Sequence, residues 1–417
     1  MKLFFTILIS GFTSVGFSQS GGLPSIIADS GKVEFKKQAD ADNPDYTLAC
    51  RILKNQVNQF PDSAELHYFL GYAIDRLNST EGSTMHQMKK ELVIEASEHF
   101  EKVNTLQPIY TGEYIVLDPY AKLSSIWGSL AQSYRVRNLK DAALWAFTEG
   151  KKRGGFTEPT LHYNRQLLNS CSKNAIFVTL GDNVTIPVWY LQTVENFRTD
   201  ITIVDANLIN TDWYGKYLKN VVKLPISFTD EEIEKIDFIK FEKRNITITN
   251  PADSLEKFTW ELRPTYLDNY ILKGDRILLN ILKENLFSRD IYFSSNSDSS
   301  SNLFLGNYMH NEGLVSKIRL KGIDFNEAAD RISTNFSAYN IDNLDSADIA
   351  KSKDAIIILN TYRWAYFANI ARLIDKGQKP KARILRNEME AKFPLDKLPY
   401  AFPRAAVYFD KLFSELD

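Results

Sequence analysis

The middle of the chain alternates between short apolar runs and helical patterns, and this alternation limits the fold more than any other feature. The first four segments are 174–180 (apolar), 186–196 (helical), 200–205 (apolar) and 211–220 (helical). Runs that are apolar on both faces are typical of strands buried on both sides of a sheet. The order strand, helix, strand, helix favours an α/β unit whose strands pair in parallel.

Later segments extend this unit. We expect a strand at 245–249, a helix at 274–285 and another buried strand at 290–294, which a serine-rich loop follows. The sequence therefore predicts a Rossmann-like α/β domain with a mostly parallel sheet, and its strands should end along one common edge.

Helical periodicity dominates the residues before this unit. Seven of them fall on the spacing of one tetratricopeptide repeat, which is a pair of packed helices: Trp127, Leu130, Ala131, Tyr134, Ala143, Phe147 and Gly150. A unit split by an insertion spans 70–108, and a weaker unit spans 366–394. The spacing is degenerate, so a generic array of helical hairpins remains the alternative interpretation.

The whole chain is predicted to be an α+β multi-domain protein in which tetratricopeptide-like repeats flank the α/β domain. Its 417 residues suit two or three domains of about 150 residues each. The predicted segments are 1–19 (signal peptide), 20–43 (linker), 44–170 (helical repeats), 171–330 (α/β domain) and 331–417 (C-terminal helical repeat).

The N-terminus indicates export. Lys2 precedes a short apolar run that ends in small and polar residues, which is the pattern of a secretory signal peptide. The alternative is a buried N-terminal strand or helix. No later run of about 18 apolar residues follows, so we expect a soluble periplasmic or extracellular protein without an integral membrane segment after cleavage.

Charge and motifs exclude several classes of function. Fifty basic residues against 52 acidic ones argue against nucleic-acid binding, which needs clustered cations. Cys50 and Cys171 are either separate buried residues or one disulfide, and neither lies near a histidine in a metal-binding pattern. The sequence has no HExxH, GxSxG or Walker motif. We therefore assign no catalytic residue, no metal and no cofactor.

Polar residues follow the predicted strands and form a candidate ligand site. They include the turn after the first strand, the segment after the second strand and Ser294 to Asn296 after the last; the candidates named are Asp182, Asn183, Thr185, Asn210, Asp212 and Trp213. Ligands of parallel sheets lie just beyond the carboxyl ends of the strands, so these groups are expected to hold a sugar or a hydrated cation. The alternative is structural, because such residues also form turns and cap helices.

Residues 174–219 resemble a known family. They are similar to the soluble C-terminal region of bacterial membrane proteins of the protein O-mannosyltransferase-like family. The matching residues are Gly181, Asp182, Asn183, Pro187, Trp189, Tyr190, Gln192, Glu195, Arg198, Thr199, Asp200, Asn210, Thr211, Asp212, Trp213 and Tyr214. Weaker likeness at 289–293, 311–314 and 393–394 extends the resemblance over roughly 174–417. Leu180 and Val184 depart from the family's polar pattern, which weakens a ligand site there.

The resemblance implies the role of a soluble portion, because the family's membrane half is not part of it. The transferase acid or base is expected in that half. We therefore expect an exported, non-catalytic scaffold or binding protein that presents its helical repeats to a protein partner, with a glycan as a further partner. The alternative is an accessory factor or enzyme of glycan transfer or processing around Asp182 and Asp212. A structural envelope component is a third hypothesis.

Overall fold

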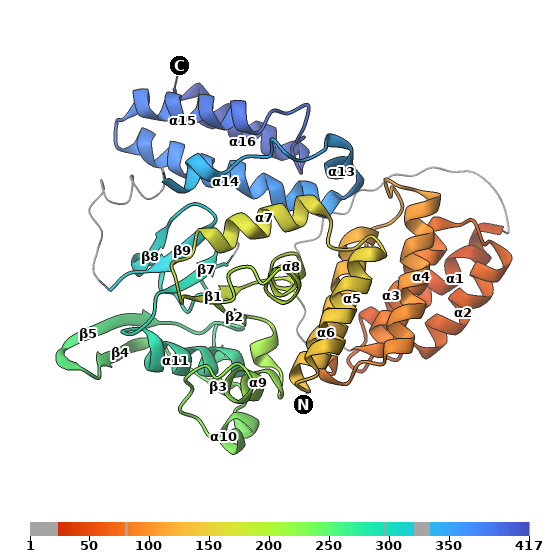
Figure 1. Ribbon diagram of the computed structural model, residues 1–417, viewed down its shortest axis with the longest axis horizontal. Helices are drawn as coiled ribbons and strands as arrows, with labels where there is room; N and C mark the ends of the chain where they lie inside the picture. Colours follow the sequence, from red (N-terminus) through yellow and green to blue (C-terminus); the bar gives the residue numbers. More distant parts are fainter. Residues whose placement is uncertain (1–23, 80–81, 296, 321–333, 417) are drawn as a thin grey trace.

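A computed structural model describes residues 24–79, 82–295, 297–320 and 334–416. The predicted signal peptide lies outside the described residues. The remainder consists of an N-terminal group of helices, a mixed sheet with its own helices, and a C-terminal group of helices (Figure 1). In the view of Figure 1, α7 lies between the sheet and the C-terminal helices. The α+β class expected from the sequence is confirmed.

The N-terminal helices pack as successive neighbours. They are α1 (Pro24–Ala39), α2 (Thr47–Gln59), α3 (Ala64–Asn78), α4 (Lys90–Leu106), α5 (Pro119–Val136), α6 (Lys140–Lys152) and α7 (Glu158–Asn169). Close approach of α5 and α6 depends on Gly150, because a Cβ there would lie 2.5 Å from the Cβ of Trp127. The Trp127 indole also donates to Ser97 Oγ of α4 at 2.9 Å. The spacing that predicted the repeat therefore marks real packing positions.

Helix α1 corrects one prediction. Residues 20–43 were expected to be a linker, but most of them are this helix. The ring of Phe35 is 2% exposed, and its centroid lies 5.3 Å from that of Tyr46 and 5.5 Å from that of Phe69. The segment is polar apart from a few apolar residues, so its periodicity is weak. Packing against α2 and α3 stabilises it as a helix.

Within the insertion predicted in the first repeat, the described residues 82–89 include one 3₁₀ turn, η1 (Met85–Gln87). The two ends of the insertion are joined by Asn78. The Asn78 amide donates to the Lys89 carbonyl at 3.0 Å, and its oxygen accepts from the Lys89 amide at 2.8 Å. The chain thus leaves α3 and enters α4 at nearly the same place.

The main sheet has five strands in the order β2-β1-β7-β9-β8. These are β1 (Ile176–Thr179), β2 (Thr202–Asp205), β7 (Ile291–Ser294), β8 (Met309–Asn311) and β9 (Val315–Ile318). Strand β1 pairs in parallel with β2 and β7, whereas β9 is antiparallel to both of its neighbours. The sheet is therefore mixed, and the expectation of a mostly parallel sheet holds for only half of its pairings. The short connection from β8 to β9 explains why these two strands run antiparallel.

Two small sheets lie outside the main one. Strands β4 (Arg244–Asn250) and β5 (Asp253–Leu262) form a hairpin, and β3 (Ile239–Lys240) pairs with β6 (Tyr270–Ile271). The strand predicted at 245–249 exists, but it belongs to the hairpin. The helices of this unit are α8 (Asp182–Val194), α9 (Tyr214–Asn220), α10 (Asp230–Lys235) and α11 (Lys273–Asn285), with 3₁₀ turns η2 (Leu208–Asn210) and η3 (Gly306–Tyr308).

The C-terminal helices are α13 (Ser346–Lys351), α14 (Lys353–Asp375), α15 (Lys379–Lys392) and α16 (Pro403–Ser414). Helix α14 packs against α15 on one side and α7 on the other. Its Arg363 is only 1% exposed and donates to the Phe393 and Leu398 carbonyls at 2.7 and 2.6 Å. This cation therefore holds the end of α15 and the loop beyond it against α14.

Within the described ranges, no helix is long and apolar enough to cross a membrane. Cys50 and Cys171 are both buried free thiols, so the disulfide alternative is not realised. Burial raises the pKa of the Cys50 thiol to about 11 and that of Cys171 still further, which keeps both thiols protonated at neutral pH.

Candidate functional site

The carboxyl end of β2 places Asp205 in a closed polar cluster. Its carboxylate is 4% exposed and accepts hydrogen bonds from the Thr185 hydroxyl at 2.5 Å and from the backbone amides of Asn207 and Leu208 at 2.9 and 2.7 Å. Thr185 also contacts the Thr179 hydroxyl at 2.8 Å. Burial raises the pKa of Asp205 to about 6, although these donors act in the opposite direction. Asp205 therefore shapes the chain after β2, and Thr185 supports it.

Asp182 and Asn183 begin α8 after Gly181, whose φ of 88° suits a residue without a side chain. Asp182 accepts a hydrogen bond from Ser125 Oγ of α5 at 2.7 Å. The Asn183 amide donates to Asp354 at the start of α14 at 2.8 Å. The turn predicted to bind a ligand thus links three helices that are distant in sequence.

A pair of buried carboxyl groups completes this junction, and no sequence pattern indicates that the two groups meet. Asp118 and Asp354 are 1% and 6% exposed. The Asp118 amide donates to Asp354 Oδ2 at 2.6 Å, and the Asp354 amide donates to Asp118 Oδ2 at 2.9 Å. Burial, and then the Asp118 charge, raise the pKa of Asp354 to about 7, and burial raises the pKa of Asp118 as well.

Each acid of the pair has a recognisable local role. Asp118 precedes Pro119 and caps α5 by accepting from the Ala121 amide at 2.8 Å. Ser352 caps α14 and donates its hydroxyl to Asp118. The capping pattern could have identified Asp118 as a cap. Its meeting with Asp354, 236 positions away, has no local signature.

The other three candidates lie around α9 and also have partners within the chain. Asn210 accepts from the Gly274 amide at 2.8 Å, and a Cβ at Gly274 would clash with the Asn210 side chain. Asp212 pairs with Lys273 at 2.7 Å, although its own side chain is 86% exposed. The capping role of the alternative interpretation is not seen for α9, because its N-cap residue is Trp213 and no side chain caps this helix.

Trp213 connects the repeat insertion to the α/β unit. Its indole donates to the Gly82 carbonyl at 3.0 Å, and its ring lies 5.7 Å from that of His86. Ser294 is 2% exposed at the end of β7, and Asn296 lies outside the described residues. The six candidate side chains therefore all make bonds within the protein, and their binding of a ligand stays a prediction.

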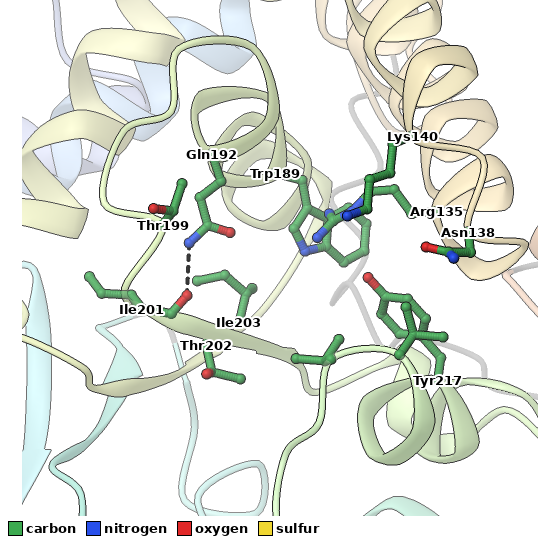
Figure 2. A pocket seen from close by; sticks show the side chains of 12 residues that line it. Arg135, Asn138, Lys140, Trp189, Gln192, Thr199, Ile201, Thr202, Ile203 and Tyr217 are labelled. Atoms are coloured by element: carbon green, nitrogen blue, oxygen red, sulfur yellow. Dashed lines mark hydrogen bonds between the residues drawn. The ribbon is translucent and has the colours of Figure 1, made fainter.

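A pocket of about 300 Å³ lies elsewhere, between the α5–α6 turn, α8, α9 and the edge strand β2 (Figure 2). None of the six candidates lines it. Its lining residues are Arg135, Asn138, Lys140, Trp189, Gln192, Thr199, Ile201, Thr202, Ile203, Tyr217, Val221 and Val222. Trp189, Gln192 and Thr199 also belong to the residues that carry the family resemblance. In the sequence these three residues stand out only because they match the family. No sequence pattern predicts that they lie beside α5 and α6, because this depends on the fold.

Over the residues that the structure covers, no group of three histidine, cysteine or acidic side chains is placed to hold a metal ion. The two close histidines, His67 and His99, contact each other through their Nδ1 atoms at 2.9 Å. They join α3 to α4 and lie apart from the strand ends.

Comparison with known families finds a match to part of the chain. The model of TMEM260-associated domain 2 matches residues 161–249 and 236–335, which span α7 and the α/β unit. No curated protein and no solved structure matches the chain significantly. The matched residues make up less than half of the chain and include all six candidates. The α/β unit is thus similar to TMEM260-associated domain 2, which fits the likeness to O-mannosyltransferase-related proteins.

Proposed function

We propose that the protein is a non-catalytic accessory of a glycan-transfer system. In this proposal the Rossmann-like α/β unit contacts a glycan or a glycan-bearing protein, and the tetratricopeptide-like helices bind a protein partner. The observation that carries the proposal is the match of 161–249 and 236–335 to TMEM260-associated domain 2. We infer from the predicted signal peptide that the protein acts in the periplasm or outside the cell.

The filled strand ends support a role without catalysis. Enzymes with parallel strands hold their substrates at this edge. Here Asp205 is enclosed by donors, and Asp182 and Asn183 bond to α5 and α14. Polar groups that bond one another hold the helices in place and are not aimed at a substrate. In this proposal the edge serves as a structural junction.

Exposed apolar side chains support a protein partner. On α6, Leu144 and Trp145 are 43% and 41% exposed. On α16, Val407 and Tyr408 are 66% and 56% exposed, and the Tyr408 ring lies 6.4 Å from that of Trp364 on α14. Grouped aromatic and aliphatic side chains are typical of protein interfaces.

The test is chemical crosslinking of the protein in its native host, followed by affinity purification and light scattering. The proposal expects a reproducible protein or glycoprotein partner and no turnover of sugar donors by the purified chain. A monomer without a partner would contradict it. Turnover of a saccharide would favour the alternative, an enzyme with a site around Asp182 and Asp212, and would then have to be lost in Asp182→Ala or Asp212→Ala.

A further inference from the structure

The pocket beside β2 is lined by residues of two predicted domains, the helical repeats and the α/β domain. The N-terminal helices contribute Arg135 from the last turn of α5, Asn138 from the turn after it and Lys140 from the start of α6. The α/β unit contributes α8, α9 and the outer side of β2. Strand β2 pairs with β1 alone in the sheet, so its other edge is open to this pocket.

The pocket carries positive charge and no negative charge. Arg135 and Lys140 line it, and no lining residue is acidic. Neither cation takes part in an ion pair with the described residues. One Nη atom of Arg135 is shielded from solvent and has no hydrogen-bond partner. The rest of the Arg135 side chain is partly exposed and lines the pocket. A guanidinium without an acceptor is unfavourable, so an anion in the pocket would give its accessible N–H groups the acceptor that this side chain lacks.

The walls of the pocket are already in place. Trp189 and Tyr217 are 2% and 5% exposed, and the Arg135 guanidinium lies 5.7 Å from the centre of the Trp189 ring. Gln192 donates to the Ile201 carbonyl at 2.8 Å, which holds α8 against the segment before β2. Figure 2 shows the Tyr217 hydroxyl and the ends of Arg135 and Lys140 directed into the same space. A preformed site binds a ligand without the cost of ordering it.

We propose that this pocket binds a monosaccharide that carries an acidic group, either a carboxylate or a phosphate. The cavity of about 300 Å³ is at the small end of ligand sites, which suits one sugar ring. Arg135 and Lys140 pair with the acid, because charge-assisted hydrogen bonds to carboxylate or phosphate are the strongest that these cations form. Asn138, Thr199 and Tyr217 supply partners for hydroxyl groups, and Trp189 supplies an apolar wall. The choice of a sugar rests on the proposed function.

The test is isothermal titration calorimetry on the full chain with five probes: glucuronate, mannose 6-phosphate, mannose, inorganic phosphate and acetate. We expect at least one sugar acid or sugar phosphate to bind roughly tenfold or more tightly than mannose, because the neutral sugar leaves Arg135 unpaired. It should also bind more tightly than phosphate or acetate, which lack the ring. The better of the two sugar anions identifies the acid that the pocket prefers.

Variants distinguish the pocket from general charge attraction. Arg135→Gln and Lys140→Gln should each weaken binding of that probe roughly tenfold. Lys152→Gln, which removes a 77% exposed cation from the same helix as Lys140, should leave it unchanged. Circular dichroism confirms that each variant is folded, and Lys140 is exposed, so its loss does not disturb the core.

Two results would overturn the inference. One is that no anionic sugar binds at millimolar concentration; the other is that Lys152→Gln weakens binding as much as Lys140→Gln does. Failure here is separable from failure of the proposed function. A chain that keeps its protein partner but binds no sugar anion would refute the pocket alone. A chain that binds the sugar anion through Arg135 but has no partner would refute the scaffold alone.

Discussion

At the scale of single residues, the His67–His99 contact shows how burial fixes a protonation state. His67 Nε2 lies 3.0 Å from the Pro61 carbonyl, so it must donate, which leaves His67 Nδ1 as an acceptor for His99 Nδ1–H. His67 is therefore neutral, and His99 must carry a proton on Nδ1. Burial lowers the pKa of both rings, that of His99 to about 4.

This pair predicts a loss of stability in acid. The pKa of His99 is 6.5 in the unfolded chain and about 4 in the folded protein. The unfolded chain therefore takes up a proton first as the pH falls, so the free energy of unfolding decreases between pH 6.5 and pH 4. His99→Gln should therefore lose less free energy of unfolding than the wild type between pH 7.5 and 5, as measured by urea denaturation. His67→Gln should behave alike, because the rings titrate as a pair. Parallel pH profiles for wild type and both variants would refute this.

The same scale includes a glycine whose missing side chain is required. Gly150→Ala places a Cβ 2.5 Å from the Trp127 Cβ and 2.9 Å from the Phe156 ring. We expect a loss of about 1–3 kcal/mol in the free energy of unfolding from overpacking, although alanine favours helix by about 1 kcal/mol. The matched control is Thr148→Ala on the exposed side of α6, which should change stability by less than about 0.5 kcal/mol. A stabilised Gly150→Ala would show that α5 and α6 are not in close contact.

At the scale of elements, the sequence predicted what local patterns encode. The apolar runs at β1, β2 and β7 and the packing positions Trp127 and Gly150 all lie where expected. The missed features depend on distant contacts. Helix α1 has too few apolar residues to show its periodicity. Strand β8 has only three residues, and the polar Ser316 and Lys317 interrupt the apolar pattern of β9. The pairing of Asp118 with Asp354 requires α5 and α14 to meet first.

The junction of α5, α8 and α14 yields a prediction about pH in the opposite direction. The pKa of Asp354 is raised to about 7, so its carboxyl keeps a proton in the folded state that the unfolded chain releases near pH 4. The contribution of Asp354 to the free energy of unfolding therefore decreases as the pH rises from about 4 to about 7. Asp354→Asn cannot ionise, and its stability relative to the wild type should rise between pH 5 and 8 in denaturant unfolding.

The variant keeps most contacts of the original side chain. The asparagine oxygen can accept from the Asp118 amide, and the Asn183 amide can turn to accept from the new amide group. A difference between variant and wild type that stays constant from pH 5 to 8 would contradict a protonated Asp354. It would indicate that the pair is separated or hydrated in solution.

At the scale of the whole molecule, the three groups of helices and strands share one core. The buried apolar residues form a single cluster from Phe35 in α1 to Leu416 after α16. Helix α14 packs on α7, and its first turn bonds to α5 through Asp118. Of the candidate strand-end residues, Asp182 and Asn183 lie at this crossing, which explains why they bond to α5 and α14. The pocket at β2 lies at a second crossing, between α5–α6 and the sheet.

A shared core predicts one cooperative unfolding transition despite the length of the chain. In differential scanning calorimetry we expect a single peak that moves as a whole when either end is weakened. Arg363→Met leaves the Phe393 and Leu398 carbonyls without their donor and should cost about 3 kcal/mol. Together with Gly150→Ala in α6, it tests the N-terminal and the C-terminal groups of helices. If Arg363→Met shifts only part of the transition and leaves a second peak unmoved, the C-terminal helices unfold on their own, and the crossing at Asp118 is too weak to join them to the rest.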